Sequence, residues 1–118
     1  MARKQSAPDC GLHAALAVLG GKWKPAILCE LHRGPARFGA LKRQVLGISE
    51  KVLFEQLREL ESTGVVLRTV LDPAPPKTVE YSLTPAGAAL TDAVQTLVEW
   101  GQHHVRIRAS APQSSIAS

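Results

Sequence analysis

The sequence predicts an α+β fold, because three features follow one another in its central part. A short helix, residues 38–45, and a glycine-containing turn precede a longer amphipathic helix over residues 48–64. Two runs that favour β-strands come next, residues 65–70 and 78–83, and a proline-rich loop joins them. Helix, turn, helix and hairpin in this order are typical of a winged helix-turn-helix, whose second helix enters the major groove of DNA.

The longer helix carries its own start and stop signals. Ser49 can cap its N-terminus, and Glu50 suits the positive end of the helix dipole. Gly64 supplies the left-handed residue that ends many helices. The spacing of its leucines predicts one buried face, made of Leu53, Leu57 and Leu60.

Two helices and a short strand are expected before this region. The first helix spans about residues 10–19 and stops at a Gly-Gly pair. The second has Pro25 in its first turn, where proline is tolerated, and ends at a Gly-Pro pair. Residues 37–38 are expected to form a short strand that pairs with the hairpin.

The last helix opens at Thr84 and Pro85, a capping hydroxyl followed by proline at the first helical position. The first and last helices together carry more apolar surface than one small domain can bury. We therefore expect them to be dimerisation helices that pack across a two-fold axis in a homodimer. Their apolar residues are Leu12, Ala15, Leu16, Leu19, Leu90, Val94, Leu97, Val98 and Trp100.

Length and composition predict a single domain. The chain has 118 residues, of which 45% are hydrophobic and 20% are charged. We expect a flexible arm over residues 1–9, the winged helix domain over residues 10–108 and a disordered tail over residues 109–118. The 14 Lys and Arg against 10 Asp and Glu give a net charge of +4, which is compatible with a polyanionic partner. The sequence contains neither a membrane span nor a signal peptide, so a cytoplasmic location is expected.

The exposed face of the longer helix is the candidate surface for reading DNA bases. Lysine and arginine can bind guanine edges, glutamate can accept from the cytosine amine, and a phenylalanine ring can contact a thymine methyl group. The alternative is an ordinary solvated face with internal charge pairs such as Lys51 with Glu55. The wing favours DNA binding. The candidate residues are Ser49, Glu50, Lys51, Phe54, Glu55 and Arg58.

Four further cations are candidates for phosphate contacts. Arg37, Lys42 and Arg43 precede the longer helix, and Lys77 lies at the tip of the wing. Such contacts position a protein on the duplex and do not specify sequence.

Several motifs together resemble the HxlR-type family of bacterial winged helix-turn-helix regulators. They are Cys10, GGKWKPAIL at 20–28, Arg37-Phe38 followed by Leu41, ISEKVLFEQLRELESTGVVLR at 48–68, VEYSLTPAG at 79–87 and Trp100. The resemblance covers about residues 10–103 and implies a dimeric DNA-binding regulator of transcription. It also implies, as in some family members, a response to oxidants or electrophiles through the N-terminal cysteine. Phe54 departs from the small polar residue that is usual at its position, which bears on the operator sequence.

Cys10 has two competing interpretations. The start of a helix stabilises a thiolate, which favours a redox switch, while Asp9 and burial in an interface disfavour that charge. The alternative is a cysteine that packs like a small hydrophobic residue. Cys10 with His13, and Cys29 with His32, also show a spacing suited to zinc, but the two pairs would have to converge, so no metal site is predicted.

The sequence has no catalytic constellation that predicts an enzyme. It contains neither a phosphate-binding glycine loop nor a metalloprotease motif, and no cofactor is predicted. The competing function is a winged helix that docks proteins without specific DNA binding. The operator, the regulated genes and any small-molecule effector cannot be identified from the sequence.

Overall fold

The computed structural model describes the backbone of residues 11–110 and the side chains of residues 11–105. The described chain runs through α1 (Gly11–Leu19), α2 (Lys24–His32), β1 (Ala36–Arg37), α3 (Phe38–Gln44), α4 (Glu50–Ser62), β2 (Val66–Asp72), β3 (Thr78–Leu83) and α5 (Pro85–Ser110). This confirms the α+β winged helix-turn-helix. The predicted arm and residues 111–118 of the predicted tail lie outside the described residues, and α5 continues through Ser110.

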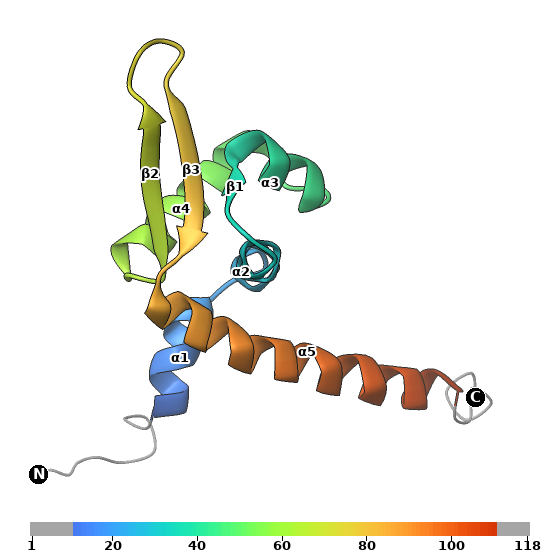
Figure 1. Ribbon diagram of the computed structural model, residues 1–118. Coiled ribbons are helices and arrows are strands. Elements are labelled where there is room, and N and C mark those ends of the chain that lie inside the picture. Colours follow the sequence, from blue (N-terminus) through green and yellow to red (C-terminus); the bar gives the residue numbers. More distant parts are fainter. Residues whose placement is uncertain (1–10, 111–118) are drawn as a thin grey trace, which may run out of the picture.

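The sheet is antiparallel, and its strands lie in the order β1-β3-β2. Ala36 and Arg68 both lie opposite Tyr81, so the three residues form one row across the sheet. The β2–β3 hairpin extends beyond the helices as the wing, with the proline-rich loop at its tip (Figure 1). The wing is therefore braced at its base by β1 and is free of other elements toward its tip.

The hydrophobic core lies where α2, α3, α4 and the base of the sheet meet. The three leucines predicted for the buried face of α4 are each 0% exposed. These residues fix which side of α4 faces outward. The buried core cluster consists of Ile27, Leu28, Leu31, Leu41, Val45, Ile48, Leu53, Leu57, Leu60, Val65, Val66 and Tyr81.

The predicted boundaries of the first two strands differ from those of β1 and β2 in the structure. Phe38, predicted as strand, is the first residue of α3, because Arg37 is already the extended N-cap of that helix. Val65, also predicted as strand, closes α4 instead: its N–H donates to Leu60 O at 3.2 Å in the six-to-one bond of a Schellman motif. Gly64 makes this closure possible with φ +84°.

The base of the wing is fastened to the start of α5. Thr84 Oγ1 accepts a hydrogen bond from Gly87 N at 3.0 Å, as predicted for a helix cap, and donates one to Gly64 O at 2.6 Å. Thr84 N also donates to Val65 O at 3.1 Å. The approach is so close that a Cβ atom on Gly87 would lie 1.9 Å from Val65 O.

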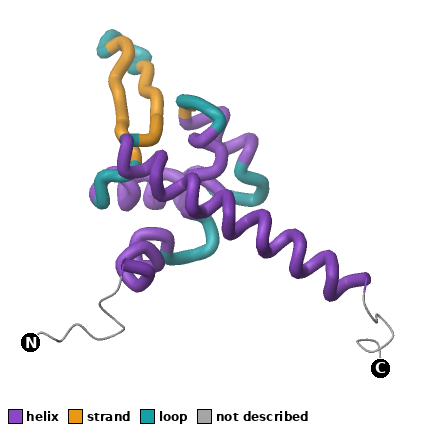
Figure 2. Tube along the Cα trace, turned by 60° about the horizontal axis from the view of Figure 1, so that its bottom comes forward, coloured by secondary structure: helices purple, strands orange, loops and turns teal. Residues whose placement is uncertain are grey.

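The outer part of α5 extends well beyond the other elements (Figure 2). Over the described residues, no helix combines the length and the apolar character that crossing a membrane requires.

Candidate nucleic-acid interface

Helix α4 is held in place at both ends and along one face. Ser49 Oγ accepts a hydrogen bond from Val52 N at 3.1 Å, which confirms the predicted N-cap. Because the leucines point into the core, the opposite face is left to solvent. This face carries the predicted base-reading residues Glu50, Lys51, Phe54, Glu55 and Arg58, all of them exposed.

The exposed face of α4 contains two side-chain pairs. Lys51 Nζ donates to Glu55 Oε2 at 2.9 Å, and this hydrogen bond together with the carboxylate charge raises the pKa of Lys51. The Arg58 guanidinium lies over the Phe54 ring, 5.6 Å from its centroid. The charge pair of the alternative interpretation therefore exists, but an exposed pair of this kind is weak enough for a ligand to displace it.

The predicted phosphate-binding cations divide into two groups. Arg37 at the end of β1 and Arg43 on α3 line one open groove of about 560 Å³ beside the sheet. Lys42, on the same helix, is half-buried, and Lys77 is exposed in the loop at the wing tip. The structure thus places Arg37 and Arg43 at the groove between α3 and the sheet, and Lys77 separately at the wing tip.

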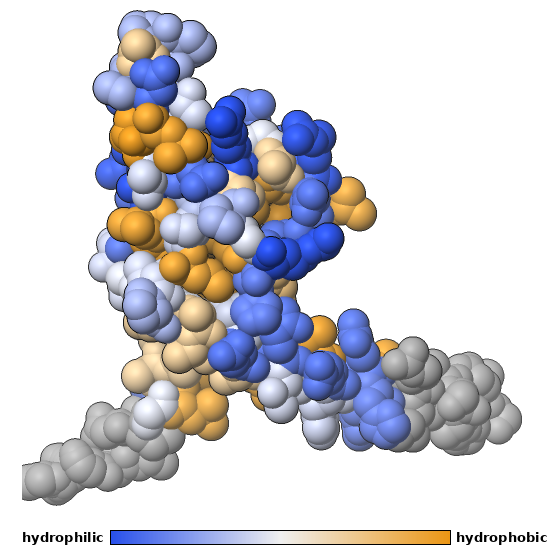
Figure 3. All heavy atoms as spheres, viewed as in Figure 1, coloured by the Kyte–Doolittle hydropathy of each residue, from blue (hydrophilic) through white to orange (hydrophobic). Residues whose placement is uncertain are grey.

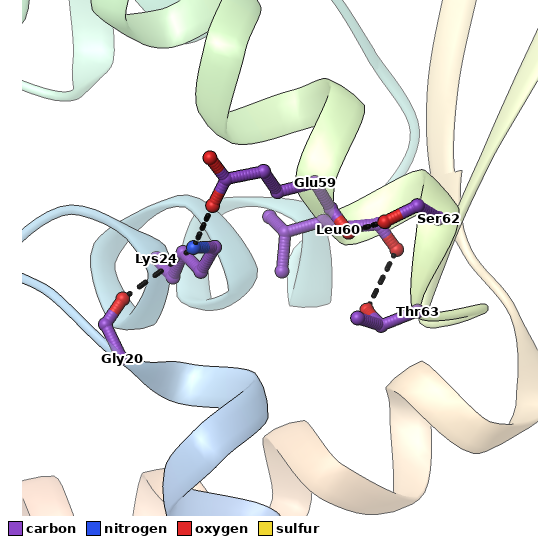
Figure 4. A network of polar contacts seen from close by, with 6 residues as sticks. All are labelled: Gly20, Lys24, Glu59, Leu60, Ser62 and Thr63. Atoms are coloured by element: carbon purple, nitrogen blue, oxygen red, sulfur yellow. Dashed lines mark hydrogen bonds and ion pairs between the residues drawn. The ribbon is translucent and has the colours of Figure 1, made fainter.

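One ion pair that the sequence did not predict ties α2 to α4. Lys24 Nζ lies 2.5 Å from Glu59 Oε1 and 3.5 Å from Gly20 O, and the lysine points from α2 toward α4 (Figure 4). The Glu59 side chain stays 59% exposed while its carboxylate turns toward α2. No sequence signal marks this pair, since 35 residues separate its partners.

Arg68 is a second residue that the sequence analysis missed. It lies on β2 and lines a hollow together with Phe54 and Arg58 of α4. Alternation along the predicted strand was the available signal, because Arg68 is two residues from the buried Val66 and so shares its face of the sheet.

The cysteines and histidines are dispersed in the part of the chain that the structure describes. Cys29 is half-buried, and burial, followed by the charge of Glu30, raises the pKa of its thiol. His32 Nε2 hydrogen-bonds with Asp92 Oδ1 at 3.0 Å. Cys10, the predicted redox residue, lies outside the described residues.

Apolar side chains reach the surface on α1 and α5. No residue of α1 is buried, and Leu12 and Leu16 are exposed. On α5, Trp100, one of the apolar residues expected at a dimer interface, is 64% exposed in the protomer and stacks on His104, with ring centroids 4.7 Å apart. Figure 3 shows hydrophobic atoms at the surface over α1, at the bottom of the view, and along the wing.

Comparison with known proteins identifies the family. A family model described as HxlR-like helix-turn-helix matches residues 18–108. The HTH-type transcriptional regulator YtcD of Bacillus subtilis (strain 168), itself uncharacterized, is 46% identical over 97 residues, which cover 82% of this chain and 76% of that protein.

Solved structures of two regulators have the same fold. The redox regulator HypR in its reduced form is 37% identical with a TM-score of 0.78, covering 86% of this chain and 99% of that one. Diamide-treated YodB of B. subtilis is 37% identical with a TM-score of 0.67, and the match covers 80% of this chain and 93% of that one. The chain belongs to the HxlR-like helix-turn-helix family of transcriptional regulators.

Proposed function

We propose that this regulator binds a palindromic DNA operator as a homodimer and reads its sequence with α4. The observation that carries the proposal is the division of α4 into a leucine face that is fully buried and an opposite face, beside the wing, whose residues are exposed. A helix fixed in this way can enter the major groove while the wing and the cations of β1 and α3 contact phosphates. The proposed DNA contacts are Arg37, Lys42, Arg43, Ser49, Glu50, Lys51, Phe54, Glu55, Arg58 and Lys77.

The dimer is proposed from the exposed apolar side chains of α1 and α5. Leu12, Leu16, Leu97, Trp100 and Val105 are each more than half exposed in the protomer. A second copy of the chain would remove them from water and bring two recognition helices to about 34 Å apart, one turn of the duplex.

The test is selection of bound fragments from random DNA, followed by titration at several salt concentrations. A palindromic consensus, with affinity that falls steeply as salt rises, is the expected result. A winged helix that only docks proteins would return no consensus and no salt-dependent shift, and this result would refute the proposal.

We further propose that Cys10 makes DNA binding responsive to oxidants. Support comes from the similarity to HypR, described as a redox regulator, and to YodB, whose structure was determined after diamide treatment. In the proposed dimer, two Cys10 thiolates would give up two electrons to diamide and join as an intersubunit disulfide. Diamide should therefore change the operator affinity of the wild type and leave Cys10→Ser unaffected; equal responses would remove Cys10 as the sensor.

A further inference from the structure

A hollow of about 500 Å³ lies between the C-terminal half of α4 and the first strand of the wing. It has an arginine on each of these two elements, Arg58 on α4 and Arg68 on β2. Its lining residues are Phe54, Arg58, Glu61, Ser62 and Arg68. Ser62 is already engaged, because its hydroxyl donates to Glu59 O at 2.8 Å.

The register of the sheet places the Arg68 side chain on the face of β2 that borders this hollow. Val66 and Arg68 share one face of β2, and Val66 is 3% exposed in the core against α4. Tyr81, directly opposite Arg68 on β3, is also buried on that face. Arg68 itself is exposed, because it lies further along the wing, past the end of the packed core. Its guanidinium therefore lies at the edge where the wing leaves α4.

The two arginines have their charges available. Neither Arg58 nor Arg68 forms an ion pair with another described residue. Phe54 supports Arg58 through its ring face, which restricts the guanidinium without neutralising it. Against these two cations the hollow holds one carboxylate, that of the half-buried Glu61. The lining is thus net cationic, and both cations are guanidinium groups suited to bidentate contact with phosphate oxygens.

We propose that the hollow seats a phosphate of the DNA backbone, held by Arg58 from α4 and by Arg68 from β2. This inference rests on the proposed DNA-binding function and divides α4 into two parts. Arg58 becomes a positioning residue, and base reading falls to the N-terminal part of the helix, where Lys51 and Glu55 lie. The seat also fixes the distance between the recognition helix and the wing on the duplex, because one phosphate is bound by both elements.

Salt dependence separates a phosphate contact from a base contact. Arg68→Ala and Arg58→Ala should each make the dependence of log affinity on log salt less steep, by up to about 0.9, the value for one phosphate contact that is lost completely. Each should also weaken binding to the operator and to an unrelated duplex by the same factor, so that the ratio of the two affinities is kept. Lys51→Ala should instead lower this ratio. A loss in Arg58→Ala that is confined to the operator would overturn the inference.

A scan with neutral methylphosphonate linkages locates the seat on the DNA. One linkage in each half-site should weaken binding of the wild type more than it weakens binding of Arg68→Ala. Lys22→Ala is the control, because Lys22 is an exposed cation between α1 and α2 that lies outside the hollow, outside the groove lined by Arg37 and Arg43, and outside the proposed DNA contacts. The control variant should show the same salt dependence of affinity as the wild type and the same loss at each methylphosphonate linkage. Circular dichroism checks folding, and Arg68→Gln gives the same readout should the alanine variant unfold.

The two proposals fail in different ways. A wild-type protein without operator preference would refute the DNA-binding function itself. A wild type that prefers its operator, combined with an Arg68→Ala variant that keeps both the salt slope and the methylphosphonate scan, would refute only the phosphate seat.

Discussion

Lys24 on α2 and Glu59 on α4 form an ion pair whose two partners differ sharply in exposure. The lysine side chain is 11% exposed and the glutamate side chain 59%. Without the glutamate, the ammonium would stay buried with Gly20 O, at 3.5 Å, as its remaining partner among the described residues. Without the lysine, the carboxylate would simply be solvated. Removal of the glutamate should therefore destabilise the contact between α2 and the recognition helix more than removal of the lysine.

We expect Glu59→Gln to lower the free energy of unfolding by about 1 kcal/mol, a value kept small because the glutamate is largely exposed. Lys24→Met should cost less, since a methionine fills the same space without a charge to desolvate. Urea unfolding of both variants measures the difference. A larger loss in Lys24→Met than in Glu59→Gln would contradict the asymmetry.

Gly87→Ala should strongly destabilise the domain, because the new methyl group would overlap Val65 O and force the wing base away from α5. The expected loss is about 1–3 kcal/mol or more, as for other overpacked sites. Gly101→Ala on the same helix is the matched control. Its Cβ atom meets no heavy atom of the described residues within 4 Å, and alanine should raise helix stability by about 0.5–1 kcal/mol. Thermal unfolding of the two variants should shift in opposite directions.

Leu97→Glu should convert the proposed dimer to a monomer, because it places a charge in the apolar surface that α5 offers to its partner. Light scattering should then give 12.6 kDa in place of twice that mass, and operator affinity should fall with it. Leu67→Glu is the control, because Leu67 on β2 is 52% exposed against 57% for Leu97 but lies on the wing. An unchanged mass in Leu97→Glu would argue against dimerisation through this face.

Cys29 should react slowly with iodoacetamide at neutral pH. Burial and the neighbouring Glu30 raise the pKa of its thiol, so the reactive thiolate forms only at higher pH than in an unperturbed cysteine. In a Cys10→Ser background, the midpoint of the rate against pH should lie higher for the folded protein than for the same chain in urea. A folded midpoint at or below the unfolded one would show that Cys29 is not held in its neutral form.

Features of the fold that depend on local signals could be predicted from the sequence. The recognition helix was predicted well because its cap, its leucine spacing and its terminal glycine all lie within residues 48–64. Features that depend on pairing between distant residues were predicted less well. The strand β2 ends at Asp72 and not at residue 70, because Asp72 gains a partner in Thr78 across an irregularity in the ladder.

In the candidate site, too, some residues are predicted by local sequence signals and others depend on contacts between distant parts of the chain. The outward residues of α4 are set by helix periodicity, whereas Arg68 joins them only through the register of the sheet and the packing of β2 against α4. The Lys24–Glu59 pair likewise depends on how two helices cross. Strand alternation indicates the face of β2 on which Arg68 lies, but it does not indicate which residues of α4 this face meets.

The fastening of the wing base to the first turn of α5 gives this helix the mechanics of a lever. Its 26 residues, at about 1.5 Å each, make an arm of about 39 Å that is fixed to the domain beside Val65 and Gly87, and again where Asp92 bonds to His32 of α2. A rotation of the domain by about 5° about the start of α5 therefore moves the far end by roughly 3 Å. In the proposed dimer the reverse also holds: a shift of several ångströms where two such arms meet turns each wing by only a few degrees. The spacing between the partners thus acts as a fine adjustment of the angle at which each wing meets the duplex.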